Sequence, residues 1–304
     1  MLEVAVIALR WLQYSGAVIL LGVPLFLLYS FRDDDRPNLA WARPALIVAA
    51  LVVALGSLVS LIAQTAVMAG SVTEAVKPAS LSFMVSGTGL GMAMLARAIV
   101  ALLAIFGLLF FRSGRALQGL AVVAGLLIAA SFAWTGHAGS TEGAGRLVHV
   151  SADIIHAIAA ALWLGTLVAL TILLLRRAGP DDPAIHRALN GFAGLGTLAV
   201  SLLVLTGLVN SWFLVSPARV GELGTSPYGQ LLIAKLLFFG LMLVFAASNR
   251  FRLTPALGSA LDAADPSPSV LSDLKRSLLL ETGLGLALLG IVAVMGTLPP
   301  PASL

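Results

Sequence analysis

Two histidines and an aspartate lie close together in the segment RLVHVSADIIHAIAAALWLG, residues 146 to 165. They are His149, Asp153 and His156. At 100° per residue of helix, Asp153 lies about 40° and His156 about 20° from His149 around the axis, so a helix presents all three on one face. Imidazole and carboxylate groups are metal ligands, and imidazole accepts both Cu(I) and Cu(II). The segment therefore predicts a metal-binding stripe on one helix.

The spacing argues against a closed metal cage built by this helix alone. His149 and His156 lie about 10 Å apart along a helix axis, too far for both to bind one ion at about 2 Å. Asp153 can reach either histidine, as a shared ligand or as a group that fixes the tautomer of one imidazole. We expect two linked sites, or a series of sites along an access path.

Other candidate donors come from outside this segment. His137 lies in the predicted outer loop WTGHAGSTEGAG, whereas His186 lies among arginines and is interpreted as a surface residue. Thioethers are soft ligands that favour Cu(I), although methionine also fills gaps in apolar cores. The methionines near the predicted outer face are Met68, Met84, Met92, Met94 and Met295. The predicted metal ligands are His149, Asp153, His156 and His137, with Met92 and Met94 as secondary donors.

The composition identifies the elements that must position these residues. Of 304 residues, 59% are hydrophobic and 11% are charged, whereas soluble domains carry about 25% charged residues. This predicts an all-α polytopic membrane bundle in the lipid bilayer, a single domain over residues 1–304. The absence of cysteine excludes disulfides and thiolate metal sites. We find no phosphate loop or hydrolase motif, and we predict a protein that is not an enzyme and binds no nucleic acid.

Eight segments reach the length of about 20 residues that spans a bilayer. The first is a retained helix rather than a cleaved signal peptide, because it starts acidic and carries Arg10 within its apolar run. The predicted spans are about 4–29, 45–69, 91–111, 117–135, 149–175, 190–215, 230–248 and 278–298. Residues 251–275 are expected to form a flexible cytoplasmic loop.

The basic residues predict the orientation, because cytoplasmic loops carry the excess of Lys and Arg. One set of alternate loops carries Arg32, Arg36, Arg43, Arg112, Arg115, Arg176, Arg177, Arg187, Arg250, Arg252, Lys275 and Arg276, and the other carries Lys77, Arg146 and Arg219. Both termini are therefore expected on the periplasmic side. The loops near residues 70–90, 136–148 and 216–229 are expected there as well.

Four further charged residues fall inside predicted spans: Arg10, Arg97, Lys235 and Glu281. Such residues usually face a bundle interior or a water-filled cavity. Arg10, Arg97 and Lys235 can instead extend to the interface, and snorkelling explains Arg10 well. We expect Arg97 and Lys235 to balance Asp153 while the metal site is empty. For Glu281, near the cytoplasmic end, ion pairing with Arg250, Arg252 or Arg276 and a gating role are the two alternatives.

Several longer stretches resemble the copper resistance D (CopD) family of bacterial inner-membrane proteins. They are ALRWLQYSGAVILLGVPLF at 8–26, GRLVHVSADIIHAIAAALWLGTL at 145–167, YGQLLIAKLLFFGLMLVFAASNR at 228–250 and LKRSLLLETGLGLALLG at 274–290. The resemblance implies copper homeostasis, with copper ion moved from the periplasm across the inner membrane, often beside a periplasmic CopC-like carrier. His149, Asp153, His156, Lys235 and Glu281 match the recurring polar positions of that family. No CopC-like domain is expected within this sequence, so such a carrier is expected to be a separate partner.

Two other functions remain open at this stage. A haem-bearing electron-transfer protein would use axial histidines, but only His149 and His156 lie on a span, on one helix near one face. A copper-handover scaffold would use the same metal site without net transport. For the cytoplasmic end of a translocation path, Glu281 and Asn249 are the candidates.

Overall fold

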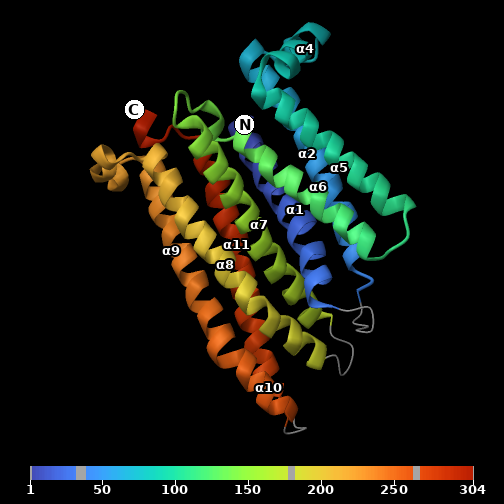
Figure 1. The fold of residues 1–304 in the computed structure, drawn as a ribbon. Helices are drawn as coiled ribbons and strands as arrows, with labels where there is room; N and C mark the ends of the chain where they lie inside the picture. The colour runs from blue at the N-terminus through green and yellow to red at the C-terminus, as the bar shows by residue number, and fades with distance from the viewer. Residues whose placement is uncertain (1, 32–38, 177–181, 263–267, 304) are drawn as a thin grey trace.

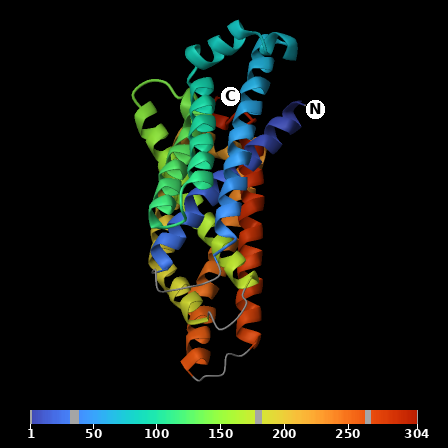
Figure 2. The same cartoon turned by 90° about the vertical axis from the view of Figure 1, so that its right-hand side faces the viewer.

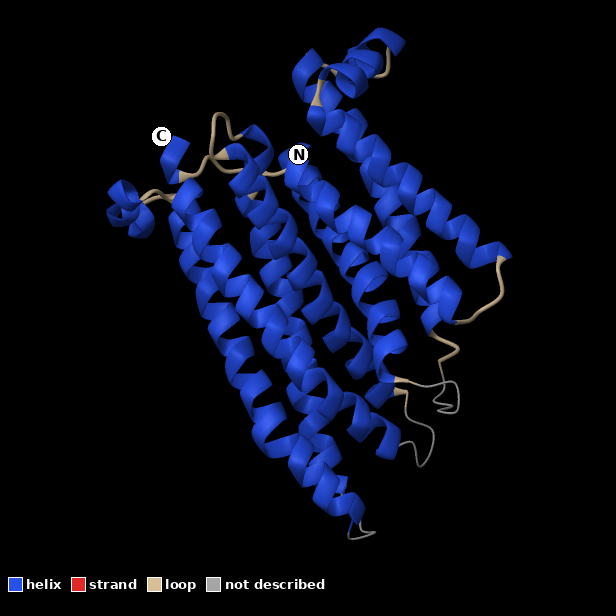
Figure 3. Cartoon of the chain, in the orientation of Figure 1, coloured by secondary structure: helices blue, strands red, loops and turns tan. Residues whose placement is uncertain are grey.

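Eight helices in the described part of the chain are long and apolar enough to cross a membrane, which confirms the predicted all-α polytopic bundle. The computed structural model describes residues 2–31, 39–176, 182–262 and 268–303. Figure 3 shows helices and loops, and no strand, within these ranges. The eight helices are α1 (Leu2–Ser30), α2 (Ala42–Ala69), α5 (Gly89–Phe110), α6 (Arg115–Ser131), α7 (Arg146–Leu175), α8 (Asp182–Leu214), α9 (Pro227–Ser248) and α11 (Pro268–Met295).

Two of the predicted loops contain additional short α-helices. The loop near 70–90 contains α3 (Val72–Ala75) and α4 (Pro78–Gly87), where the Ser71 side chain caps α3 by accepting from the Glu74 amide. The loop predicted at 251–275 begins later than expected, because α9 continues through a π-helical turn, η4 (Asn249–Leu253), into α10 (Thr254–Asp262). It also ends earlier, because α11 begins at Pro268. Residues 263–267 lie outside the described ranges. Short 3-10 turns complete the structure: η1 (Phe132–Trp134), η2 (His137–Ser140), η3 (Pro217–Gly224) and η5 (Pro301–Ser303).

Helix α1 lies at the centre of the arrangement and packs against α2, α6, α7 and α11. Figures 1 and 2 show α2, α5 and α6 on one side of it, and α7, α8, α9 and α11 on the other. α7 packs against α1, α8 and α11, and α9 packs along α11. The four helices α7, α8, α9 and α11 therefore form a sub-bundle that shares α1 as a wall.

Glycine brings α1 and α7 into backbone contact. A Cβ added at Gly22 would lie 2.5 Å from the Cα of Gly165 and 2.6 Å from the carbonyl oxygen of Ala161. Small residues at such crossings let membrane helices approach closely and gain van der Waals contact. The crossing fixes α1 against the middle of α7, and so fixes the stripe that α7 carries.

The outward faces of the helices are apolar. Leu103 and Phe110 on α5, Leu205 on α8 and Leu237 on α9 are all more than 60% exposed. An apolar surface of this extent marks contact with other apolar matter, and together with the helix lengths it indicates a lipid-embedded protein. The buried core instead holds a few polar side chains, among them Arg97, His149 and Glu281.

Both chain ends lie at the same end of the bundle, which is uppermost in Figures 1 and 2 and is called the upper end. The helix ends that carry most of the basic residues lie at the opposite, lower end. Of the twelve residues in the predicted cytoplasmic set, Arg32, Arg36 and Arg177 lie outside the described residues.

Candidate functional site

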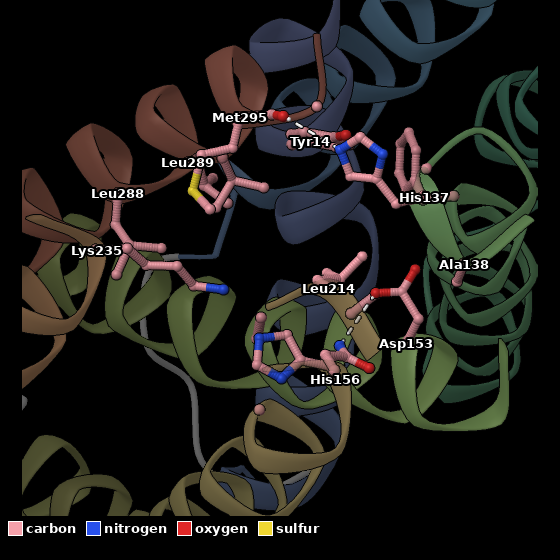
Figure 4. Close-up of a pocket in the computed structure, with 18 of the residues that line it drawn as sticks. Tyr14, His137, Ala138, Asp153, His156, Leu214, Lys235, Leu288, Leu289 and Met295 are labelled. Atoms are coloured by element: carbon pink, nitrogen blue, oxygen red, sulfur yellow. Dashed lines mark hydrogen bonds between the residues drawn. The ribbon is translucent and has the colours of Figure 1, made fainter. Parts of the chain in front are cut away.

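A cavity of about 210 Å³ opens between α1 and the sub-bundle near the upper end. Its polar lining includes Tyr14, His137, His149, Asp153, His156, Asn210, Tyr228 and Lys235. Figure 4 shows His137, Asp153, His156 and Lys235 around the same space, with Met295 at its side. This upper cavity therefore brings together four of the predicted metal ligands, three of them from the α7 stripe.

His137 begins the turn η2 and reaches the cavity from the loop side. Its Nε2 lies 3.3 Å from the carbonyl oxygen of Met295. Because a carbonyl only accepts, Nε2 carries the proton and Nδ1 keeps its lone pair. Burial lowers the pKa of His137 from its usual value, the hydrogen bond to Met295 opposes this change, and the charge of Arg10 adds to it. The ring is therefore neutral near pH 7, the state that binds metal.

His149 is 2% exposed and is held on two sides. Its Nδ1 lies 2.7 Å from the hydroxyl of Thr141, and its ring stacks on Phe213 at a centroid distance of 4.6 Å. These contacts fix the plane of the imidazole and leave Nε2 without a hydrogen bond among the described residues. A fixed ring with one unused nitrogen is a suitable metal ligand.

The tautomer of His156 follows from its partner on α8. The Thr206 hydroxyl donates to the carbonyl oxygen of Leu202 at 2.6 Å, so its single proton is already used. The Nδ1 of His156, 2.9 Å from the same hydroxyl oxygen, must therefore be the donor. Nε2 then keeps its lone pair, and Thr206 holds the ring as the outer partners of metal-bound histidines do.

Asp153 and Lys235 line the same cavity without forming a direct ion pair among the described residues. Asp153 Oδ1 accepts a hydrogen bond of 3.3 Å from the Asn210 amide. The Lys235 side chain points into the cavity from α9 (Figure 4). The cavity thus holds one carboxyl group and one amino group near three imidazoles.

The cavity ligands do not form a closed cage in this structure. Within the described ranges, no three His, Asp or Glu side chains lie close enough together to hold one ion. His137 and His149 also line a second space above, the upper mouth, together with Phe213 and residues 296–303. The two histidines thus separate the mouth from the deeper Asp153 and His156. This arrangement agrees with a series of binding positions along an access path.

Arg97 does not balance Asp153, contrary to the prediction. It is 2% exposed and belongs to a separate group between α1, α2, α5 and α6, where it donates to Gln13 Oε1 at 3.0 Å and to Thr135 Oγ1 at 3.1 Å. Arg10 points into the same region, with its guanidinium 3.4 Å from the Thr135 carbonyl oxygen, and does not extend to the interface as predicted. Counting depth along the helices does not identify the neighbours of these residues, which include Gln13 and Thr135.

The predicted methionine donors lie away from the upper cavity. Met92 is 58% exposed on α5, and Met94 packs with Leu61 and Met84. Of the methionines near the upper end, Met295 lines the cavity. The structure therefore gives Met92 and Met94 no position from which to contact an ion beside His156.

Glu281 lies near the lower end and is 1% exposed. It accepts a hydrogen bond of 2.9 Å from the Asn249 amide, and no ion pair with Arg250, Arg252 or Arg276 is found among the described residues. Of the two sequence-based alternatives, the structure does not support pairing with arginine.

Comparison with known proteins decides the family. The family description "Copper resistance protein D-like, N-terminal domain" matches residues 1–147, and "Copper resistance protein D" matches residues 186–295. The chain is 36% identical to Copper resistance protein D from Pseudomonas syringae pv. tomato, over 97% of this chain and 96% of that protein. The chain belongs to the copper resistance protein D family.

Two further relatives are similar over part of this CopD-family chain. Copper transport protein CutJ of Bacillus subtilis is 30% identical over 58% of this chain and 29% of its own length. Inner membrane protein YebZ of Escherichia coli is 29% identical over 55% of each chain. No solved structure is significantly similar. The names of these relatives support a copper-related membrane function for the family member described here.

The structure adds site residues that sequence reasoning missed. Tyr14, Asn210 and Tyr228 line the upper cavity, and Thr141 and Thr206 orient histidines. All five are uncharged, so intramembrane charge does not identify them. Polar residues at helical spacing on α1, α8 and α9 were the signal available in the sequence.

Proposed function

We propose that this CopD-family protein binds a copper ion in the upper cavity and transfers it across the bacterial inner membrane. The observation that carries the proposal is the convergence of His137, His149, Asp153 and His156 on one cavity. Nitrogen and oxygen ligands of this kind suit copper. The relatives' names supply the identity of the metal, which the geometry alone does not.

The distribution of charge supports an orientation with the upper end facing the periplasm. The described basic residues of the predicted cytoplasmic set, such as Arg43, Arg115 and Arg276, lie on segments at the lower end, as the positive-inside rule requires of cytoplasmic loops. Copper then enters through the upper mouth, supplied directly or by a separate CopC-like periplasmic carrier.

The function is tested by copper binding to the purified full chain in detergent. We expect Cu²⁺, or Cu⁺ in the presence of ascorbate, to bind the wild type. We expect the double variant His149→Ala with His156→Ala to lose at least 100-fold in affinity, because two of four converging ligands are gone. The matched control is His186→Ala, which removes a histidine outside the cavity. Full binding by the double variant would sink the site assignment.

The same preparation separates the alternative functions. A Soret absorbance band in the purified protein would indicate a haem protein rather than a copper carrier. Vesicles containing the protein and an enclosed copper-sensitive dye distinguish transport from handover. A copper-dependent signal inside the vesicles supports transport, and tight binding without any signal supports a handover scaffold.

Lys235 is expected to weaken copper binding, because its positive charge faces the same cavity as the metal ligands. We predict that Lys235→Gln increases copper affinity on the order of tenfold, because two positive charges in one partly buried site repel each other by at least about 1 kcal/mol. Lys77→Gln is the control, since Lys77 is exposed and paired with Glu74 at 2.6 Å. Unchanged or weaker binding in Lys235→Gln would show that the ammonium group does not oppose the ion.

A further inference from the structure

A second cavity with polar groups lies in the same sub-bundle near its lower end. Its volume is about 520 Å³, and it is lined by residues of α7, α8, α9, α10, α11 and the turn η4. Its polar residues include Asn190, Thr197, Asn249, Arg250 and Glu281. None of the predicted metal ligands near the upper end takes part in it.

Two buried oxygen atoms in this lower cavity have no hydrogen-bond partner among the described residues. They are Oε1 of Glu281 and Oδ1 of Asn249, on two side chains that are joined by the hydrogen bond from Asn249 Nδ2 to Glu281 Oε2. Buried acceptors are normally satisfied, so an exception calls for an explanation such as an ion. A carboxylate oxygen and an amide oxygen on neighbouring side chains present two ligand atoms to a cation.

No ion pair with Glu281 is found among the described residues, so its unpartnered Oε1 is open to a ligand. Arg250 also lines the cavity, but its guanidinium donates to Thr197 Oγ1 at 2.5 Å. Asn249 is the first residue of the π-helical turn η4, and such turns interrupt helices frequently at functional sites. The π-helical turn and the unpartnered oxygen atoms are two independent observations, and both indicate a functional site at Asn249.

The two cavities are aligned along the same helices. On α11 the upper cavity reaches Leu288 and the lower cavity begins at Glu281, seven residues or about 10 Å away. The α11 residues between these two line neither cavity.

An apolar plug fills the level between the two cavities. Trp163, at the edge of the lower cavity, meets Phe239 edge to face at 5.7 Å. Leu164 and Met242 pack at Gly285, where an added Cβ would lie 3.4 Å from the terminal methyl of Met242. An ion that passes from the upper to the lower cavity must therefore cross a short packed apolar layer.

We propose that the lower cavity is a second copper site, the position from which the ion leaves toward the cytoplasm, with Glu281 and Asn249 as its ligands. This inference rests on the proposed function and deepens it. Oxygen ligands accept Cu(II), but without imidazole the site is weaker than the upper one. Weak binding suits a release position, because conduction requires that an ion also be able to leave.

Copper counting on the purified full chain tests the proposal. With Cu²⁺, and with Cu⁺ in ascorbate, we expect the wild type to bind one ion tightly and a second more weakly. Glu281→Gln is expected to keep the tight ion and to lose at least tenfold in affinity for the second. The matched control is Asn190→Ala, which changes another polar residue of the same cavity. Binding of a single ion by the wild type, or an unchanged second ion in Glu281→Gln, would overturn the proposal.

A second variant guards against loss of binding through misfolding. Asn249→Asp places another carboxylate beside Glu281 and is expected to bind the weak ion more tightly, a gain that unfolding cannot produce. Unchanged or weaker binding of that ion would contradict the assignment. The double histidine variant separates the two proposals, because it should lose the tight ion and keep the weak one.

Transport into vesicles gives the functional readout. We expect Glu281→Gln to slow copper entry at least tenfold while the tight ion is retained. Slower entry with an unchanged weak ion would make Glu281 a proton-carrying group and overturn the copper assignment. If the wild type binds no copper at all, both the proposed function and the lower site are contradicted.

Discussion

Gly165→Val is expected to prevent stable assembly of the bundle. A Cβ at this position would meet the carbonyl oxygen of Val18 and the Cα of Gly22, and these are backbone atoms that cannot rotate away. Overpacking in a core usually costs about 1–3 kcal/mol, and occasionally more. We expect the upper end of this range or beyond, because two helix backbones must separate to admit the side chain.

The measurement is the thermal unfolding midpoint together with the elution profile in detergent. The matched control is Gly240→Val on α9, where nothing lies within 4 Å of an added Cβ. We expect the control to behave like the wild type and Gly165→Val to unfold at a clearly lower temperature or to aggregate. Equal midpoints for the two variants would show that the α1–α7 contact does not determine stability.

Arg97→Met is expected to cause the second large loss of stability. Besides its bonds to Gln13 and Thr135, the guanidinium donates to the Ser131 hydroxyl at 2.8 Å and carbonyl oxygen at 3.1 Å, and lies 3.8 Å from the centroid of the Phe132 ring. Hydrogen bonds to a charged group each contribute about 1.5–3 kcal/mol. Methionine fills similar space but leaves these acceptors short of a donor, so we expect a loss of about 3 kcal/mol or more.

Denaturant or thermal unfolding measures this loss of stability, and two further variants serve as comparisons. Arg97→Lys keeps the charge but loses the planar fork, and its stability should fall between that of the wild type and that of Arg97→Met. Arg219→Met removes an exposed arginine that lies 3.4 Å from Glu222, and should change stability by about 0–1 kcal/mol. Copper affinity of folded Arg97→Met should match the wild type, since Arg97 lies outside the upper cavity. A large change in affinity would restore the link between Arg97 and Asp153.

Hydropathy predicted the eight spans because burial in lipid demands long apolar helices. Hydropathy did not predict α10, which lies beyond the predicted spans and continues from α9 through a polar π-helical turn. α10 packs against α8, and tertiary packing of this kind leaves little trace in a hydropathy average. The capping serine of α3 and the proline that begins α4 were visible in the sequence, but helices of 4 and 10 residues are too short to be detected as spans.

The α7 stripe was predictable because helical periodicity places His149, Asp153 and His156 on one face. Which helix faces that stripe was not predictable from one sequence. Depth counting put Arg97 and Lys235 at one level, yet one faces Gln13 and the other faces the upper cavity. The level of a residue follows from the rise per residue, whereas its neighbours follow from side-chain packing across the bundle.

The apolar plug also determines where the membrane voltage acts. If water fills both cavities, they conduct ions better than the packed side chains of Trp163, Leu164 and Met242, and the potential then falls chiefly across this short barrier. A charge that crosses the full potential changes in energy by about 2.3 kcal/mol per 100 mV. In the proposed orientation, an inside-negative membrane would drive a copper ion inward across this layer, which measures about 10 Å along α11, and Cu²⁺ would feel twice the force on Cu⁺. The thickness of the plug thus determines the strength of the electric field that acts on the ion.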